Sequence, residues 1–253
     1  MTSSHRPSIG QQIAADLRAA IQSGKLPPGQ TIESERKLVE RYGTTKVTVR
    51  KVIETLKAEG LLVSEPGSGI RVREIKRLDR LGSRRHLRSQ RPAGTSPLEA
   101  EAAAQGVHRE LILREVISFL PPPGIADLLQ ITPETPLVVR RHLVTLDGHP
   151  AATADSYIPA HLVEGSRIAR HEPIPGGVHA ELADLLGTPL TGAVEMLVAR
   201  MPNPDETETL RLPPGTPVVE LTRTIHAGDR PVEVTVWLFD ASRHRFVYEV
   251  PVD

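Results

Sequence analysis

The chain has 253 residues, of which 39% are hydrophobic, so it is long enough for two modest domains with their own cores. It contains no cysteine, which excludes a disulfide framework, thiol catalysis and cysteine-based zinc sites. The first ten residues are too polar for a signal peptide, and no apolar run approaches the length of a membrane span. We therefore expect a cytoplasmic protein that does not enter a membrane.

The net charge of zero hides an asymmetry between two parts of the chain. Residues 1–91 contain 19 Lys and Arg against 9 Asp and Glu, a net charge of +10, and every lysine lies at or before Lys76. Residues 92–253 contain 12 Lys and Arg against 22 Asp and Glu, a net charge of −10. The first part is therefore expected to attract a polyanion, and the second is not.

The first sixty residues predict three helices. Apolar residues recur at helical spacing over Ile9–Gln22, and a Pro- and Gly-containing segment follows. Ser34–Tyr42 is the second predicted helix, and Gly43 ends it at a position where a positive φ is favourable. The third helix is expected to run from a cap at Thr44 or Thr45 to residue 60. Two short strands within residues 61–74 then predict a hairpin with a Gly-rich turn.

The first turns of the third helix are rich in hydroxyls and cations, which are mediocre helix formers at that position. The short connection to the second helix predicts a steep crossing that projects this helix end outward. Hydroxyls and helix N-terminal N–H groups bind phosphate, while Arg and Lys also read guanine edges. Cations oppose the helix dipole there, so a purely solvated helix end leaves Lys46 unexplained. We therefore predict that Thr45, Lys46, Thr48 and Arg50 contact duplex DNA.

Residues 78–94 are rich in arginine and short of large apolar residues, so we interpret 77–92 as a linker, which could also continue the basic surface. After this segment the residue pattern changes. Two hairpins of similar form suggest an internal duplication, although their similarity is weak. An α+β domain on an antiparallel sheet is predicted. Its expected helices are Ser96–Gly106, 123–131, His179–Leu186 and Asp205–Leu210; its expected strands are Glu110–Leu120, the hairpins 135–159 and 216–240, Ala193–Met201 and 246–252.

Long, ordered motifs in both parts resemble one family. GKLPPGQTIESERKL, TKVTVRKVIETLKAEGLL and PGSGIRV resemble the GntR family of bacterial transcription regulators. DGHPAATADSYIPA, IPGGVHAELADLLG, LPPGTPV and the pattern from Arg223 to Glu233 resemble the UTRA domain of its HutC-type branch, whose fold is similar to chorismate lyase. The resemblance implies a winged helix-turn-helix domain at 1–76, a linker at 77–92, and an effector-binding and dimerisation UTRA domain at 93–253.

The resemblance also implies a homodimer on a palindromic operator, with the third helix in the major groove and the hairpin wing in the minor groove. The function it implies is a ligand-responsive repressor without a cofactor or metal. Lys46 stands where the family has arginine, so this contact could be to a base with looser preference or to phosphate. By motif position, the expected DNA contacts are Arg36, Thr45, Lys46, Thr48, Arg50, Gly67 and Ser68.

Sugar-phosphate-sensing members of the branch carry an R-x-R motif that maps to His142 and Val144 here, so the phosphate-binding arginines are absent. Either the effector is less anionic, or Arg140 or Arg141 substitutes. The residues expected at the effector pocket are Thr95, Ser96, His142, His179, Glu233 and Phe239.

Two other functional classes fit the sequence less well. An enzyme is the first, since the C-terminal fold resembles a lyase, but no HExxH or GxGxxG pattern is present, and a basic helix-turn-helix has no use in a lone enzyme. An architectural DNA-binding protein without an effector is the second. The separate acidic domain of about 160 residues argues against that class. A non-enzymatic regulator is therefore the expected function.

Overall fold

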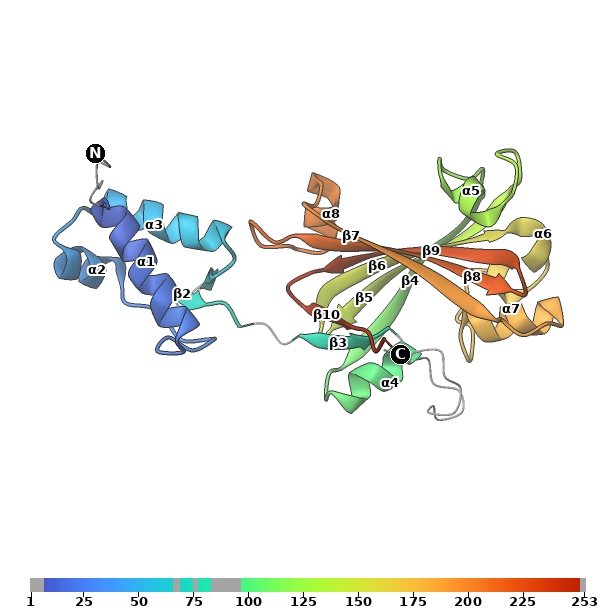
Figure 1. Cartoon of the computed structure of the whole chain (residues 1–253), viewed down its shortest axis with the longest axis horizontal. Coiled ribbons are helices and arrows are strands. Elements are labelled where there is room, and N and C mark those ends of the chain that lie inside the picture. Colours follow the sequence, from blue (N-terminus) through green and yellow to red (C-terminus); the bar gives the residue numbers. More distant parts are fainter. Residues whose placement is uncertain (1–6, 66–68, 75–76, 83–96, 251–253) are drawn as a thin grey trace. The chain divides into compact units, whose positions relative to one another are not determined.

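Figure 1 shows the computed structural model, which describes residues 7–65, 69–74, 77–82 and 97–250. The chain divides into two units. The first comprises residues 1–76 and Met201–Thr216, and the second comprises residues 77–200 and 217–253. The segment 201–216, which contains the short helix α8 (Pro204–Thr209), thus groups with the first unit, whereas the sequence assigns it to the second domain.

The first unit has the predicted three helices and hairpin strands. Its helices are α1 (Ile9–Gln22), α2 (Glu35–Tyr42) and α3 (Lys46–Ala58). Strand β1 (Leu62–Glu65) pairs antiparallel with β2 (Gly69–Val72), while the expected turn between them lies outside the described residues.

Local signals fix the helix ends of this unit. Ser8 and Gln11 form a reciprocal capping box at the start of α1, and the Ser34 side chain accepts the Lys37 N–H at the start of α2. Gly43 follows α2 with a φ of 60°, the left-handed conformation predicted for it.

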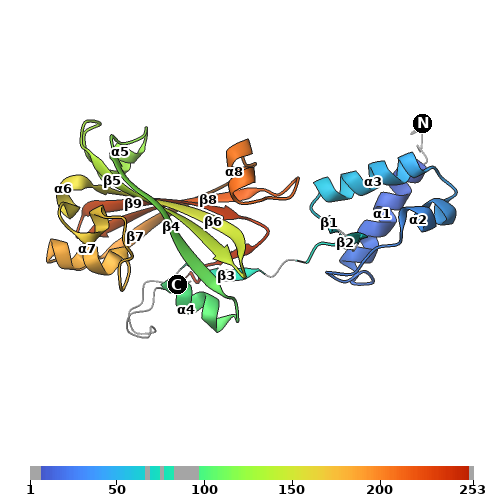
Figure 2. The ribbon, with the colours of Figure 1, turned by 180° about the vertical axis from the view of Figure 1, so that it is seen from behind.

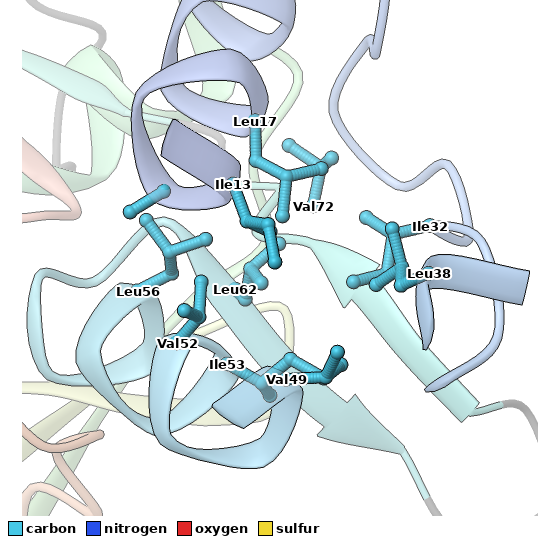
Figure 3. Close-up of a cluster of buried hydrophobic side chains, with 11 residues drawn as sticks. Ile13, Leu17, Ile32, Leu38, Val49, Val52, Ile53, Leu56, Leu62 and Val72 are labelled. Atoms are coloured by element: carbon cyan, nitrogen blue, oxygen red, sulfur yellow. The ribbon is translucent and has the colours of Figure 1, made fainter. Parts of the chain in front are cut away.

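One apolar cluster holds the first unit together (Figure 3). Ile13 of α1 and Val49 and Leu56 of α3 have no exposed surface, and Leu38 of α2 is 1% exposed. Leu62 and Val72 close the cluster from the hairpin. The buried positions of α3 lie three or four residues apart, so its other face, which carries Lys46 and Arg50, is left outside the core.

The second unit is built on a six-stranded antiparallel sheet with strand order β4-β5-β6-β9-β8-β7. An α+β architecture is therefore confirmed. The strands are β4 (Arg109–Phe119), β5 (Leu137–Leu146), β6 (His149–Pro159), β7 (Gly192–Arg200), β8 (Val218–Ala227) and β9 (Arg230–Asp240). The helices are α4 (Pro97–Ala104), α5 (Ile125–Leu129), α6 (Ala160–Val163), the 3-10 turn η2 (Arg167–Ala169) and α7 (Val178–Leu186).

Helices cover both faces of this sheet. Figures 1 and 2 place α5 on one side and α7 on the other. Residues Leu137 and Val139 pack with α5, whereas their neighbour Val138 packs with Leu182 of α7 and Ile168 of η2. This alternation is the period of two expected for a strand buried on both faces.

The linker interpretation is wrong for Leu78–Leu81. These residues form strand β3, which pairs in parallel with the last strand, β10 (His244–Val247), rather than with a chain neighbour. Leu78 is 2% exposed and packs with Ala102, and Arg80 is 2% exposed. The expected final strand 246–252 is accordingly shorter and begins earlier. The rest of the expected linker, residues 83–92, lies outside the described part of the chain.

Candidate nucleic-acid interface and ligand site

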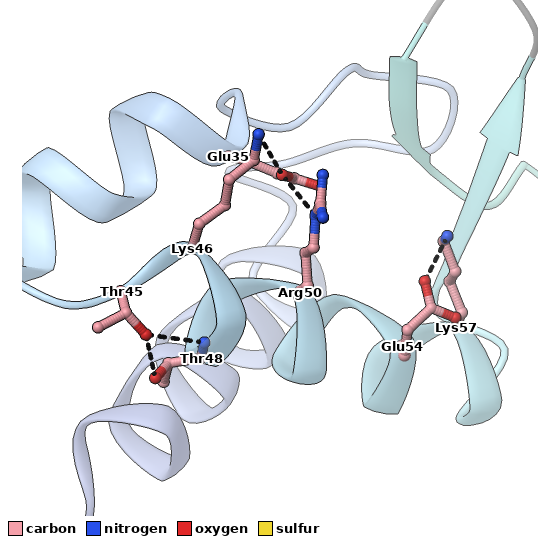
Figure 4. Close-up of polar contacts among 7 residues, drawn as sticks. All are labelled: Glu35, Thr45, Lys46, Thr48, Arg50, Glu54 and Lys57. Carbon is pink, nitrogen blue, oxygen red and sulfur yellow. Dashed lines mark hydrogen bonds and ion pairs between the residues drawn. The ribbon is translucent and has the colours of Figure 1, made fainter.

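The N-terminal end of α3 is organised by two hydroxyls. The Thr45 Oγ1 atom accepts the backbone N–H of Thr48 at 3.2 Å and lies 3.0 Å from the Thr48 Oγ1 atom (Figure 4). Thr45, not Thr44, is thus the N-cap residue. The cap satisfies one of the free N–H groups of the first turn and leaves others facing solvent.

Two cations at this helix end share one carboxylate. The Glu35 Oε2 atom lies 3.0 Å from Arg50 Nε and 3.9 Å from Lys46 Nζ (Figure 4). Because Glu35 opens α2, its charge is also favoured by the dipole of that helix. Exposed pairs of this kind contribute about 0–1 kcal/mol each to stability. Their main consequence is geometric, since one carboxylate orients two cations on the same surface.

The predicted DNA contacts on α2 and α3 are largely in solvent. The side chains of Arg36, Lys46 and Arg50 are 81%, 64% and 61% exposed, and Arg36 lies 3.8 Å from Glu40. Sequence reasoning missed Val47, which follows Lys46 in the first turn of α3 and is 77% exposed. Its signal was available, because an apolar residue off the buried face of an amphipathic helix has no role in the core.

The hairpin turn carries two further expected DNA contacts. Gly67 and Ser68 fall outside the described residues, as do Thr95 and Ser96 of the expected effector pocket. Glu33 precedes the Ser34 cap and pairs with Arg41 at 3.4 Å.

A row of polar side chains crosses one face of the six-stranded sheet. Residues directly opposite one another on antiparallel strands point to the same side, and the register links five such residues in sequence across β5, β6, β9, β8 and β7. Each is buried or nearly so. The row is Arg140, Ser156, Thr235, Arg223 and Glu195.

Two neighbouring pairs of the row are bonded. The hydroxyls of Ser156 and Thr235 lie 3.2 Å apart, and the Arg223 Nη2 atom lies 2.6 Å from Glu195 Oε1. Arg223 belongs to the family motif and Arg140 was named as a possible phosphate ligand, but Ser156, Thr235 and Glu195 were missed. The signal was a polar residue at each position where a buried strand should be apolar.

Glu233 and His179 meet beside this row, as two separately predicted pocket residues. Glu233 of β9 is 1% exposed, and its Oε2 atom lies 2.7 Å from His179 Nε2 of α7. The Thr235 hydroxyl donates to the other carboxylate oxygen at 2.9 Å. Burial by itself raises the pKa of Glu233, but the His179 charge and the hydrogen bonds with His179, Thr235 and Ser156 outweigh burial and lower this pKa to about 2.

His142 lies on the same face, one row away, with Ala154 and then Trp237 opposite it on the next strands. Burial, followed by the charge of Arg140, lowers the pKa of His142 to about 4, so the imidazole is neutral at pH 7. Trp237 is 7% exposed, and its Nε1 atom is buried without a hydrogen-bond acceptor among the described residues. His142 and Trp237 are thus neutral polar groups on the face that also carries Glu233.

Phe239, in contrast, is a core residue. It is fully buried, stacks on Trp237 with ring centroids 5.4 Å apart, and lies beneath the Arg80 guanidinium at 4.3 Å. It lies six positions along β9 from Glu233, so the structure does not bring Phe239 to the His179–Glu233 pair.

The two arginines that could replace the phosphate-binding motif are already engaged. The Arg140 guanidinium donates to the carbonyl oxygens of Ile168, Arg170 and Glu172 at 2.8–2.9 Å. Arg141 lies 2.9 Å from Glu115 and 3.3 Å from Asp155 on the other face. Arg140 thereby fixes the loop after η2, and burial lowers its pKa.

In the placed part of the chain, no group of three or more His, Asp and Glu side chains is arranged to hold a metal ion. None of the helices that the structure describes is long and apolar enough to cross a lipid bilayer.

Comparison with known proteins decides the family. Residues 9–72 match the profile of the bacterial regulatory proteins of the gntR family, and residues 104–245 match that of the UTRA domain. The chain belongs to the GntR family. Its UTRA domain fits the HutC-type branch, and the family is non-enzymatic. GntR regulators bind DNA and UTRA domains bind small-molecule effectors, so this chain is a DNA-binding transcriptional regulator with an effector domain.

Several relatives match this chain over nearly its whole length. An HTH-type transcriptional regulator of Streptomyces coelicolor is 29% identical over 249 residues, which cover 96% of this chain and 92% of that protein. One of Mycobacterium tuberculosis is 27% identical and covers 95% and 85%. A solved GntR-family regulator structure is 28% identical with a TM-score of 0.66, covering 98% and 99% of the two chains. PhnF of Mycobacterium smegmatis has the same fold, at 20% identity and a TM-score of 0.59, over 95% and 100%.

Proposed function

We propose that this GntR-family protein is a cytoplasmic homodimer that represses transcription from a palindromic operator and releases it when a small molecule binds the UTRA domain. The observation that carries the DNA-binding half is the clustering of Thr45, Lys46, Thr48 and Arg50 at the free N-terminal end of α3. Two such helix ends in a dimer would enter successive major grooves roughly 34 Å apart.

Within that interface, each exposed group takes a role suited to its chemistry. The Thr45 and Thr48 hydroxyls and the free N–H groups of the first turn contact phosphate. Arg50 reads a guanine edge, and Lys46 adds a point charge to a base or phosphate. Val47, with its exposed apolar side chain, contacts a thymine methyl group.

Arg41 supplies a matched control for Arg50. Both side chains are 61% exposed and both pair with a glutamate, but Arg41 lies at the end of α2. Duplexes selected by the full chain from a random library would be titrated by fluorescence anisotropy at several salt concentrations. Arg50→Ala should weaken binding by about 1–3 kcal/mol and reduce the salt slope by about 1, while Arg41→Ala should change the affinity much less. Equal effects of both variants would remove Arg50 from the interface.

For the effector, we propose an uncharged or weakly charged polar ligand rather than a sugar phosphate. The charges on the polar face already have partners: Arg140 bonds backbone carbonyls, Arg223 bonds Glu195, and Glu233 pairs with His179. A phosphate would have to displace one of these bonds in a buried setting, which is costly. The neutral His142 imidazole and the buried Trp237 N–H can instead bond a polar ligand.

Effector binding needs to change only the dimer geometry. A coupling free energy of roughly 1–3 kcal/mol is typical of linked sites, and it suffices to shift occupancy when the operator is near half-saturation. Thermal-shift screening of the full chain against neutral sugars, amino acids and sugar phosphates would identify what stabilises the native protein. A hit restricted to sugar phosphates would contradict the proposed ligand class.

The pocket assignment has its own test. Glu233→Gln should change the operator affinity in the absence of ligand by no more than about twofold. It should raise the ligand concentration needed for release at least about tenfold, because the ligand loses one hydrogen bond to a charged carboxylate. Glu220→Gln is the control, because Glu220 pairs with Arg200 at 2.8 Å on the other face of the sheet. Unchanged release by Glu233→Gln would discard this pocket.

A further inference from the structure

A carboxylate lies within the cationic surface at the start of α3. The side chains of Arg36, Lys46 and Arg50 are 81%, 64% and 61% exposed, whereas that of Glu35 is 27% exposed. Figure 4 shows Glu35 between Lys46 and Arg50. A carboxylate here repels the phosphates that this surface is proposed to bind. Glu35 therefore needs an explanation other than general attraction to DNA.

The position of Glu35 at a helix start explains only part of its placement. As the first residue of α2, it is favoured by the dipole of that helix. That effect needs no cation, yet the carboxylate bonds Arg50 through both oxygens and lies 3.9 Å from Lys46. Both cations belong to the next helix, α3. Contact with α3 is thus a separate feature of this side chain.

The contact occupies one part of the Arg50 guanidinium and leaves the rest open. Arg50 Nε lies 3.0 and 3.3 Å from the two Glu35 carboxylate oxygens. A guanidinium carries five N–H groups, of which Nε holds one and the two Nη atoms hold four. Among the described residues, no hydrogen bond or ion pair of Arg50 involves its Nη atoms. These two atoms can form a bidentate contact with guanine O6 and N7.

Glu35 is itself held in place by the core. It begins α2 directly after the Ser34 cap, and α2 is anchored by Leu38, which is 1% exposed. A long arginine side chain in solvent samples many rotamers, and orienting it on binding costs entropy. An anchored carboxylate on Nε reduces that cost, because the guanidinium plane is already oriented before DNA arrives.

We propose that Glu35 is a positioning residue that sets base specificity at the operator base pair contacted by Arg50. It presents the Nη atoms of Arg50 to one guanine, and its charge weakens attachment to phosphates at other sequences. This inference rests on the proposed function, in which Arg50 reads a guanine edge.

The charge balance supports the second effect. Lys46, Arg50 and Glu35 together carry a net charge of +1, and removing the carboxylate leaves +2. Non-specific affinity depends on the number of phosphates neutralised, so the salt slope on unrelated duplexes should steepen by up to about 1. The same change leaves Arg50 unoriented, so affinity for the preferred base pair should not rise in step. Specificity, which is the ratio of the two affinities, therefore falls.

Base discrimination is the measurement that tests this role. Duplexes selected by the full wild-type chain from a random library would be altered one base pair at a time and titrated by fluorescence anisotropy. The base pair read by Arg50 is the one whose alteration matters least to Arg50→Ala. There the wild type should favour the selected pair about 5–150-fold, the range for one bidentate contact. Glu35→Gln should lower this ratio at least about threefold and should tighten binding to unrelated duplexes.

Glu33→Gln is the matched control. It removes the same charge two positions away, but Glu33 pairs at 3.4 Å with Arg41 in the last turn of α2. It should leave the discrimination unchanged, so that any effect of charge alone appears in both variants. Because the ratio compares two duplexes with one protein sample, partial unfolding of a variant cancels from it. Equal ratios for Glu33→Gln and Glu35→Gln would overturn the proposal.

A second variant separates orientation from charge. Glu35→Asp keeps the negative charge at the start of α2 but draws the carboxylate back from Arg50 by one methylene group. It should lower the discrimination as Glu35→Gln does, without tightening the binding of unrelated duplexes. Discrimination equal to that of the wild type would contradict a positioning role.

The Arg50→Ala background shows whether Glu35 acts through Arg50. In that background Glu35→Gln should change the discrimination at no base pair, because the side chain that Glu35 orients is absent. A loss of discrimination that persists there would show that Glu35 reads a base directly, and the positioning role would be wrong.

The proposed function fails on a different result. A wild-type chain that prefers no duplex over any other would sink sequence-specific operator binding. A wild-type chain with clear preferences, which Glu35→Gln and Glu35→Asp both leave intact, would sink only the role of Glu35.

Discussion

The His179–Glu233 pair should respond unequally to the loss of its two members. Glu233 is 1% exposed, whereas the His179 side chain is 36% exposed. Replacing His179 leaves the buried Glu233 carboxylate without its imidazole partner, and removing one partner of a buried pair typically costs 3–5 kcal/mol. Because Thr235 still donates to Glu233 at 2.9 Å, we expect His179→Asn to cost about 3 kcal/mol, the low end of this range. Glu233→Gln leaves a half-solvated imidazole and should cost about 1 kcal/mol.

A single intrinsic probe measures this difference. Trp237 is the one tryptophan of the chain and lies buried in the second unit, stacked on Phe239. Its fluorescence during urea unfolding of the full chain at pH 7.5 therefore reports the free energy of unfolding of that unit. If Glu233→Gln proves more destabilising than His179→Asn, the reasoning from burial is refuted.

The pH dependence gives a second check on the same pair. In the wild type the pKa of Glu233 is lowered to about 2, so its contribution to stability is present above pH 4.5 and lost as the pH falls from 4.5 to 2. Without His179, burial dominates and raises the pKa of Glu233 above 4.5. The folded variant then binds a proton before the unfolded chain does, so its deficit should narrow as the pH falls from 7.5 toward 4.5. A deficit that widens over this range contradicts the account.

Three other changes test local features. Thr45→Ala removes the α3 cap and should lower the free energy of unfolding by about 1 kcal/mol, with the loss of helix monitored by circular dichroism. Thr44→Ala should lower it little. Gly43→Ala places a β-carbon at a φ of 60° and should cost about 1 kcal/mol in the same measurement. Burial and Arg140 lower the pKa of His142 from 6.5 to about 4, so up to about 3 kcal/mol should be lost as the pH falls through this window. His142→Gln should flatten that loss in urea titrations at pH 7 and pH 5.

Local chemistry made the first unit predictable from its sequence. Caps at Ser8 and Ser34, and the glycine at position 43, lie within a few residues of the helix ends they define. The apolar spacing of α3 separates its core face from the face that carries Lys46 and Arg50. Each signal acts over one or two helical turns, which is the range that a pattern in sequence can report.

The features missed depend on pairing between distant residues. Strand β3 exists because His244–Val247 lies beside it, and Asp79 contacts Arg245 across 166 positions of sequence. The polar row is likewise visible only when the register of five strands is known. A four-residue strand and one polar residue per strand are too little local pattern to reveal either feature.

The charged side chains of the DNA-binding helix are exposed, whereas those of the polar row in the second unit are buried. The two parts of the chain should therefore respond differently to salt. Lys46 and Arg50 are more than half exposed, so salt screens their attraction to phosphate and counterion release makes DNA affinity fall steeply with salt. Arg223 is 4% exposed with its partner Glu195 at 13%, and Glu233 is 1% exposed, so salt screens these pairs little. Raising the ionic strength should therefore release DNA while leaving the effector domain folded and able to bind its ligand. Ligand-driven release of DNA can thus be measured at low salt, because the stability of the effector domain depends little on the salt concentration.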